Sequence, residues 1–305
     1  MRIAFAGTPS AAVPTLEALI AAGHDLAFVV TRPDAPKGRG RVMTVSPVAE
    51  VAQAHGLECL KTSQLAEIAD RIAEVDCVVV VAYGGLVPDE LLNVPRHGWV
   101  NVHFSLLPAW RGAAPVQHAI LAGDDVTGVT TFRIDSGLDT GGVLGHVATS
   151  IGPRETAGSL LERLSVVGAE LMVQTLDGLE REMISPVPQP ADGISKASKI
   201  ATADAQIDWT HPALAIDRRV RAMTPEPGPW TTCQGKRVKL GPVTVVVDAP
   251  EGAQHLSAGQ TIQIGTDVFV GTGSQPVKLS QVQLEGRTMV DAHIWLGNRE
   301  GVVFE

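Results

Sequence analysis

The sequence predicts an α/β domain with a doubly wound parallel sheet, followed by a smaller β-rich domain. Three observations lead to this prediction. Strand-like and helix-like segments alternate through the first 183 residues, a stretch rich in proline and serine follows, and short β-branched runs dominate the remainder. Strand–helix alternation is typical of a parallel sheet covered by helices on both faces. A chain of 305 residues also exceeds what one core usually serves.

Hydrophobic patterning locates the elements of the first domain, which we place at residues 1–183. Strands are expected at 3–6, 26–30, 76–82, 99–103 and 128–134, and helices near 13–20, 116–121 and 156–179. The run 76–82 (DCVVVVA) is apolar throughout, as expected of a parallel strand buried on both faces. Such sheets bind ligands at the carboxyl ends of their strands.

The remainder reads as a linker at 184–205 and a second domain at 206–305. The stretch SPVPQPADG (185–193) has the composition of a linker. After one helix at 212–223, strands are expected at 238–240, 243–247, 261–264, 268–270 and 277–282. Short strands separated by glycine and aspartate turns suggest a small barrel or sandwich.

Composition narrows the class of protein. The three cysteines (Cys59, Cys77, Cys233) are far apart and form no CxxC, which favours a reducing compartment over a disulfide framework or zinc site. No signal peptide or membrane-spanning run is recognised, so we expect a cytoplasmic protein. The net charge of −9 argues against general affinity for nucleic acid, although a local basic surface stays possible.

Asn101 and His103 stand at the carboxyl end of an expected strand. Side chains at i and i+2 point to the same face of a strand, so an amide and an imidazole share one cavity. Asp139 lies in a glycine-flanked loop (IDSGLDTGG) after the strand at 128–134 and reaches His103 if the two strands are neighbours. This set suits acyl transfer, with two donors to an oxyanion and a carboxylate that orients the imidazole. The alternative is a strand-end Asn and His that satisfy backbone groups, beside a turn-forming Asp.

Other catalytic motifs are missing. The turn AGTPSAA lacks GxGxxG, and no GxxxxGK[ST] is present, which argues against a nucleotide site. Without GxSxG, direct transfer between two bound substrates fits better than a covalent intermediate. No HExxH or similar cluster supports a metal site.

Basic residues gather in two places. The segment 31–47 (TRPDAPKGRGRVMTVSP) carries Arg32, Lys37, Arg39 and Arg41, and we expect a mobile basic loop that contacts phosphates, or else an ordinary solvated loop. Towards the carboxyl end the basic residues are Arg218, Arg219, Arg221, Lys236, Arg237 and Lys239. Basic residues on a helix are commonly a solvated face, whereas a small barrel beside them is a frequent nucleic-acid binder.

Several motifs together resemble methionyl-tRNA formyltransferases. They are GTP at 7–9, RPDAPKGRGR at 32–41, NVHFSLLPAWRGAAP at 101–115, GLDTGG at 137–142, IDW at 207–209 and RAMTPEPGPW at 221–230. The resemblance runs in order along nearly the whole chain. It implies a Rossmann-like formyltransferase domain and an OB-fold-like carboxy-terminal domain that binds tRNA.

The resemblance also implies a reaction. Formyl would pass from 10-formyltetrahydrofolate to the α-amine of initiator methionyl-tRNA, giving formylmethionyl-tRNA for translation initiation. Apart from the resemblance, we expect no metal, no membrane partner and a monomer. Carried over by motif, the catalytic set is Asn101, His103 and Asp139. The folate site is lined by Ser105, Leu106, Leu107 and Pro108, and the tRNA is contacted by Arg39, Lys37 and Arg41. Phe104 stands where the family usually has a small residue, which would narrow the folate entrance.

Three alternatives stay open at this point. A formyltransferase for an amino-sugar nucleotide is similar in length, but the basic loop and Trp110 favour tRNA. A glycinamide ribonucleotide formyltransferase has no need of residues 206–305. A non-catalytic RNA-binding relative would not need Asn101, His103 and Asp139 together.

Overall fold

A computed structural model describes residues 1–37, 42–297 and 301–305, with only the main chain described at Lys37. The chain divides into two compact units. Unit 1 comprises Met1–Pro115, Val126–Ser150 and Leu161–Ala197, and unit 2 comprises Val116–Asp125, Ile151–Leu160 and Ser198–Glu305. Among the described residues, no helix combines the length and apolar character needed to cross a membrane.

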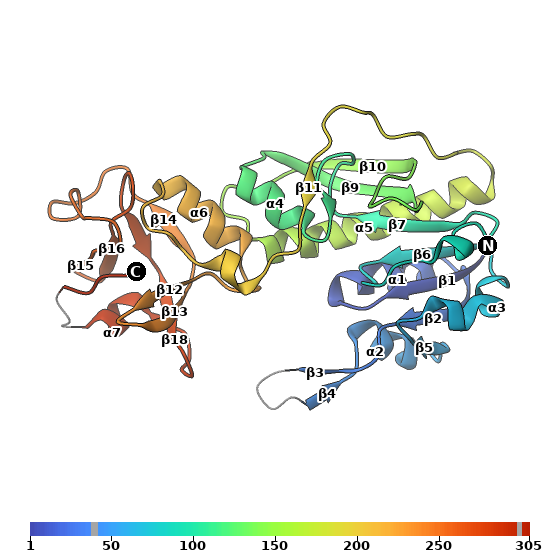
Figure 1. Cartoon of the computed structure of the whole chain (residues 1–305), viewed down its shortest axis with the longest axis horizontal. Helices are drawn as coiled ribbons and strands as arrows, with labels where there is room; N and C mark the ends of the chain where they lie inside the picture. The colour runs from blue at the N-terminus through green and yellow to red at the C-terminus, as the bar shows by residue number, and fades with distance from the viewer. Residues whose placement is uncertain (38–41, 298–300) are drawn as a thin grey trace. The chain divides into compact units, whose positions relative to one another are not determined.

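Unit 1 is built on a sheet in which seven of the described strands lie in the order β10-β9-β7-β6-β1-β2-β5 (Figure 1). Their bounds are β1 (Arg2–Gly7), β2 (Asp25–Thr31), β5 (Cys59–Lys61), β6 (Cys77–Val81), β7 (Trp99–His103), β9 (Val126–Arg133) and β10 (Val143–Ser150). The strands from β7 to β5 are parallel, which confirms the predicted parallel sheet. Strand β9 is antiparallel to both of its neighbours, β7 and β10.

The central strands of the sheet bury side chains on both faces, and β6 is buried along its whole length. The helices that begin in the first 160 residues are η1 (Ser10–Ala12), α1 (Val13–Ala21), α2 (Pro47–Ala54), η2 (Leu65–Ile68), α3 (Ala69–Ile72), η3 (Asp89–Leu91), α4 (Pro115–Ala122) and α5 (Ala157–Glu180). Helix α5 packs closely against β7 and β9 at Gly168, where an added Cβ would lie 2.8 Å from Val102 and 3.2 Å from Val129. The side chain of Val102 therefore faces α5.

The basic segment 31–47 contains two short strands that the sequence did not indicate. Strands β3 (Ala35–Lys37) and β4 (Val42–Thr44) pair in antiparallel register. The prediction of a loop throughout was wrong for these residues, because pairing between the two strands satisfies main-chain groups that a loop would leave to water. Arg39 and Arg41 lie outside the described residues.

Unit 2 contains two antiparallel sheets with the strand orders β12-β13-β18-β19 and β14-β17-β16-β15. The strands are β12 (Trp230–Cys233), β13 (Lys236–Leu240), β14 (Val243–Val245), β15 (Thr261–Ile264), β16 (Asp267–Val270), β17 (Val277–Leu279), β18 (Gln281–Leu284) and β19 (Val290–Asp291), with helices η4 (Thr202–Ala205), α6 (Ala213–Ala222) and α7 (Ala292–Leu296). Trp209 and Trp295 both stack on Phe304 in the core, with ring centroids 5.5 and 5.6 Å apart. The prediction of a β-rich carboxy-terminal part is confirmed, and an OB-fold-like closure stays a prediction.

Candidate active site

Strand β7 presents Asn101 and His103 on the face of the sheet opposite α5. This follows from strand periodicity, because Val102 between them faces the helix. His103 is only 5% exposed, and the ring of Phe132 on the neighbouring β9 lies edge-on to it at 6.3 Å. Asn101 is half-buried, and among the described residues none forms a hydrogen bond with its side-chain amide. The amide is therefore available to a ligand on this face.

The main chain determines which nitrogen of His103 carries the proton. Its Nε2 atom lies 2.9 Å from the carbonyl oxygen of Trp110, and because a carbonyl only accepts, Nε2 donates. The other nitrogen, Nδ1, is 3.7 Å from Oδ2 of Asp139, too far for a direct hydrogen bond. Burial lowers the pKa of His103, and the Asp139 carboxylate and the Trp110 carbonyl oppose this effect without cancelling it. The imidazole is therefore neutral near pH 7, with Nδ1 able to accept a proton.

Asp139 reaches His103 by a route that differs from the expected one. Because β9 is antiparallel to β7, its end at Arg133 pairs with Val100, away from His103. The loop after β9 therefore runs back towards the carboxyl end of β7, where Asp139 lies beside His103. Asp139 itself has a left-handed backbone (φ 51°), a conformation that costs a non-glycine residue about 1–3 kcal/mol. Its Oδ2 atom accepts a hydrogen bond of 2.7 Å from the main-chain N–H of Gly112.

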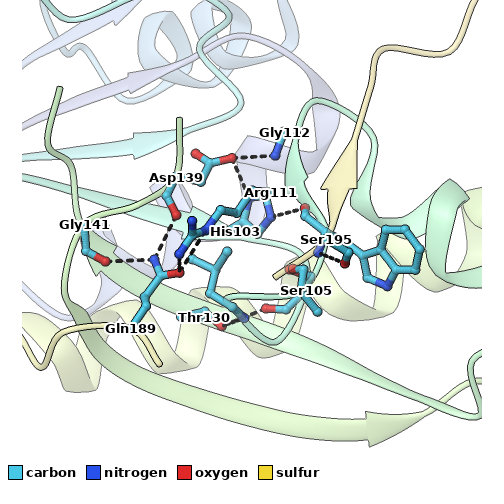
Figure 2. A network of polar contacts seen from close by, with 12 residues as sticks. His103, Ser105, Arg111, Gly112, Thr130, Asp139, Gly141, Gln189 and Ser195 are labelled. Atoms are coloured by element: carbon cyan, nitrogen blue, oxygen red, sulfur yellow. Dashed lines mark hydrogen bonds and ion pairs between the residues drawn. The ribbon is translucent and has the colours of Figure 1, made fainter. Parts of the chain in front are cut away.

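Gln189 joins the loop that carries Asp139 to the segment that carries Arg111 (Figure 2). Its side-chain Nε2 donates to the main-chain carbonyls of Asp139 and Gly141, both at 2.8 Å. Its Oε1 accepts from Nε and Nη2 of Arg111, at 3.0 and 2.6 Å. Gln189 lies within the stretch that composition suggested to be a linker, and it nevertheless contacts the loop that carries Asp139.

The same stretch makes a second set of contacts with the segment after Trp110. The hydroxyl of Ser195 accepts a 2.8 Å hydrogen bond from the main-chain N–H of Trp110. Beyond it, β11 (Lys196–Ala197) pairs in parallel with β8 (Arg111–Gly112). Residues 189–197 thus hold the segment whose carbonyl and N–H groups contact His103 and Asp139.

The loop after β7 holds the four residues expected to line a folate site. Ser105 is fully buried, and its hydroxyl donates to the carbonyl of Ala109 at 2.6 Å. Thr130 of β9 holds the same loop, because its hydroxyl donates to the Ser105 carbonyl and accepts from the Leu107 N–H. Pro108 is buried and follows a cis peptide bond, whereas Leu106 and Leu107 are half-buried. The Ser105 hydroxyl is thus engaged within the loop.

Phe104 does not narrow this face of the sheet. It is 8% exposed, and its ring lies 3.8 Å from the position of a Cβ built at Gly168 of α5. Phe104 therefore packs on the α5 side, like Val102 two residues earlier. The expected narrowing of the folate entrance was wrong, because strand-like alternation continues beyond His103.

The basic residues of unit 2 differ in their surroundings. Arg221 is largely buried, with its Nε 2.8 Å from Oδ2 of Asp217 and its Nη1 donating to the Glu155 carbonyl. Arg219 donates to the Asp204 carbonyl. Arg237 lies over the ring of Trp230 at 3.9 Å, a cation–π contact. Arg221 is therefore held by structural contacts and is not part of a solvated helix face.

The site residues that sequence reasoning missed are mostly main-chain groups. The carbonyl of Trp110 and the N–H of Gly112 have no side-chain signature, although WRG is a marked motif. Gln189 and Ser195 follow α5 in a polar stretch where nothing in the local pattern distinguishes them. No three His, Cys, Asp or Glu side chains form a metal-binding group within the part of the chain that is described.

Comparison with known proteins identifies both parts of the chain. A family model described as formyl transferase matches residues 1–176, and one described as formyl transferase, C-terminal domain, matches residues 199–299. The methionyl-tRNA formyltransferase of Arthrobacter sp. (strain FB24) is 53% identical over 311 residues, which cover 100% of both chains. That of Thermobifida fusca (strain YX) is 52% identical over 299 residues, covering 97% of this chain and 95% of the relative.

Solved structures share the fold at low identity. HypX from Aquifex aeolicus in complex with tetrahydrofolic acid superposes with a TM-score of 0.69 at 17% identity, covering 97% of this chain. This chain spans about half of HypX, 47% of its length. The N-formyltransferase of Helicobacter canadensis, in complex with folinic acid and dTDP-3-aminofucose, has a TM-score of 0.69 at 17% identity, covering 92% and 99% of the two chains. At these identities the likeness concerns the fold alone.

Proposed function

Because this chain belongs to the methionyl-tRNA formyltransferase family, we propose that it transfers formyl from 10-formyltetrahydrofolate to the α-amine of initiator methionyl-tRNA. Identity of 53% and 52% along the whole chain supports the tRNA acceptor. The observation that carries the chemistry is the placement of Asn101, His103 and Asp139 on one face of the sheet. The product, formylmethionyl-tRNA, serves translation initiation in the cytoplasm.

The reaction sets three requirements for the protein. The amine nitrogen bonds to the formyl carbon, and the bond between that carbon and N10 of the folate breaks. Between these events the formyl oxygen carries negative charge, which needs hydrogen-bond donors already in place. One proton leaves the attacking amine, and one reaches the departing N10.

Asn101 is the proposed donor to the oxyanion. Its amide has no partner among the described residues and lies on the same face as His103, two residues away on β7. Strand β7 lies between β6 and β9 in the sheet, which keeps the amide in place before the charge develops. A donor that needs no rearrangement stabilises the transition state more than the ground state.

His103 and Asp139 are the proposed proton carriers. With Nε2 bound to the Trp110 carbonyl, the neutral ring offers Nδ1 as the base for the amine proton. The carboxylate of Asp139, 3.7 Å from Nδ1, stabilises the imidazolium that results. That imidazolium then donates to the oxyanion and returns a proton to N10, so one proton enters and one leaves.

The folate donor is proposed to lie against the loop after β7. Leu106 and Leu107 are half-buried and supply apolar surface, while Ser105 and Pro108 act by holding the loop in shape. No metal takes part in the proposed reaction. For the tRNA, the basic segment with Lys37, Arg39 and Arg41 is the proposed contact, on the strength of its sequence.

The decisive experiment is formyl transfer from 10-formyltetrahydrofolate to initiator methionyl-tRNA. Wild-type protein should form formylmethionyl-tRNA, and methionyl elongator tRNA and an amino-sugar nucleotide serve as competing acceptors. Transfer only to the amino-sugar nucleotide would mean that the proposed acceptor is wrong and that the proposed chemistry of formyl transfer is right. Absence of both transfer and donor hydrolysis would contradict the proposal as a whole.

A further inference from the structure

The side-chain amide of Gln189 forms hydrogen bonds through both its nitrogen and its oxygen, beside the candidate active site (Figure 2). The nitrogen end donates to the carbonyls of Asp139 and Gly141, and the oxygen end accepts twice from Arg111. A flipped amide would place oxygen against two carbonyls and N–H groups against a guanidinium, so this orientation is the one that satisfies every group. The side chain is half-buried, which strengthens these hydrogen bonds relative to bulk water.

The position of the Asp139 carboxylate depends on the two segments that Gln189 joins. The carboxylate accepts from the N–H of Gly112, the residue after Arg111, and makes no direct hydrogen bond with His103. Its own backbone is in the left-handed region and relies on its surroundings. Among the described residues, Gln189 is the one side chain that donates a hydrogen bond to the Asp139 carbonyl.

We infer that Gln189 is a positioning residue for formyl transfer, which holds the Asp139 loop against the segment 111–112 so that the carboxylate lies beside His103. This inference rests on the proposed function, because it assigns the carboxylate a role in that reaction. It assigns an active-site role to the segment between α5 and β11, whose composition is that of a linker.

Two substitutions distinguish the hydrogen bonds that Gln189 donates from those that it accepts. Gln189→Met keeps the length of the side chain and removes all its hydrogen bonds. Gln189→Glu keeps an acceptor for Arg111 and loses the donor to the two carbonyls. Both should lower kcat roughly tenfold to a hundredfold, as expected when a reacting group is misplaced by about 1 Å. The KM for tRNA should stay within about twofold of wild type. Asp192→Asn, at an exposed position in the same segment, is the matched control.

A double-mutant comparison tests whether Gln189 acts through Asp139. In an Asp139→Asn background, Gln189→Met should lower the residual rate by less than about twofold, because the group it positions has lost its charge. A further tenfold loss would overturn the inference, and so would a single Gln189→Met variant with kcat within twofold of wild type. If Gln189→Met does not fold, Gln189→Glu is measured in the same two backgrounds.

The rate of donor hydrolysis, measured in the absence of tRNA, tests the role of Gln189 independently of the proposed tRNA acceptor. If wild-type protein hydrolyses 10-formyltetrahydrofolate slowly but does not formylate tRNA, the acceptor is wrong. The ratio of hydrolysis rates between wild type and Gln189→Met then decides the inference, with equal rates overturning it and a tenfold deficit supporting it.

Discussion

The Nε2 atom of His103 donates a 2.9 Å hydrogen bond to the main-chain carbonyl oxygen of Trp110. Trp110 has a left-handed backbone (φ 60°), and the turn it forms carries its carbonyl to the imidazole. A peptide group therefore determines the tautomer of His103, a role that the sequence suggested for Asp139. The carboxylate, 3.7 Å from Nδ1, is placed to act through its charge on the protonated ring.

Replacing Asn101 by alanine should remove one donor to the oxyanion. We expect kcat to fall by about a hundredfold to a thousandfold, the usual loss for such a donor, with little change in the Kd of the folate donor. Single-turnover formylation and equilibrium binding measure the two quantities. Asn93→Ala, an exposed residue that contacts Arg133, is the control. An Asn101→Ala enzyme within threefold of wild type would refute the assignment.

Replacing Asp139 by asparagine should keep the contact with Gly112 and remove the charge beside His103. The amide oxygen can still accept from the Gly112 N–H, so the loop should retain its shape. We expect kcat to fall by about a hundredfold to ten-thousandfold, the range for a group that assists proton transfer. Rates near wild type, with an unchanged melting temperature, would mean that the charge takes no part in the reaction.

The titration of His103 should reveal the balance between burial and the neighbouring carboxylate. Burial lowers its pKa, so the ring should become protonated only below pH 6.5, the ordinary value for histidine. The Asp139 carboxylate favours the protonated form, and its loss in Asp139→Asn should move the midpoint to still lower pH. NMR titration of the imidazole protons measures both midpoints. A higher midpoint in Asp139→Asn would contradict the proposed electrostatic coupling.

Arg39 should contribute to tRNA binding through a phosphate contact, as its sequence context predicts. Arg39→Ala should raise the KM for tRNA and reduce the dependence of log KM on log salt by about one, the effect of one lost phosphate contact. Arg181→Ala, which removes an exposed arginine after α5, controls for the change in net charge. An unchanged salt dependence would mean that Arg39 makes no such contact.

Gly112 should be intolerant of a side chain. Its φ is 126°, and a Cβ there would collide with the carbonyl oxygen of Ala197 across the β8–β11 pair. We expect Gly112→Ala to lower the free energy of unfolding by about 1–3 kcal/mol, measured by urea denaturation. Gly193 also has a positive φ (81°) but has open space around it, so Gly193→Ala should cause a smaller loss. Equal losses would indicate that backbone conformation alone limits both positions.

Local patterns in the sequence were sufficient for the parallel strands β1, β2, β6 and β7 and for the pair on β7, whereas β5 and β10 were not predicted. The apolar run in β6 and the i, i+2 spacing of Asn101 and His103 depend only on neighbours along the chain. They did not reveal that β9 is antiparallel, because a strand's apolar pattern reads the same in either direction. The β3–β4 pair was missed because each strand has only three residues, too few to show a strand period.

The sequence by itself determined the fold class, the family and the face of β7 that carries Asn101 and His103. Only the tertiary structure decided which main-chain and side-chain groups surround Asn101 and His103 on that face. The contacts of Gln189 with Arg111 and Asp139 join residues 78 and 50 positions apart, and the contact between Ser195 and Trp110 spans 85. Periodicity along a strand is a local property of the chain, whereas these hydrogen bonds exist only once packing has brought distant segments together.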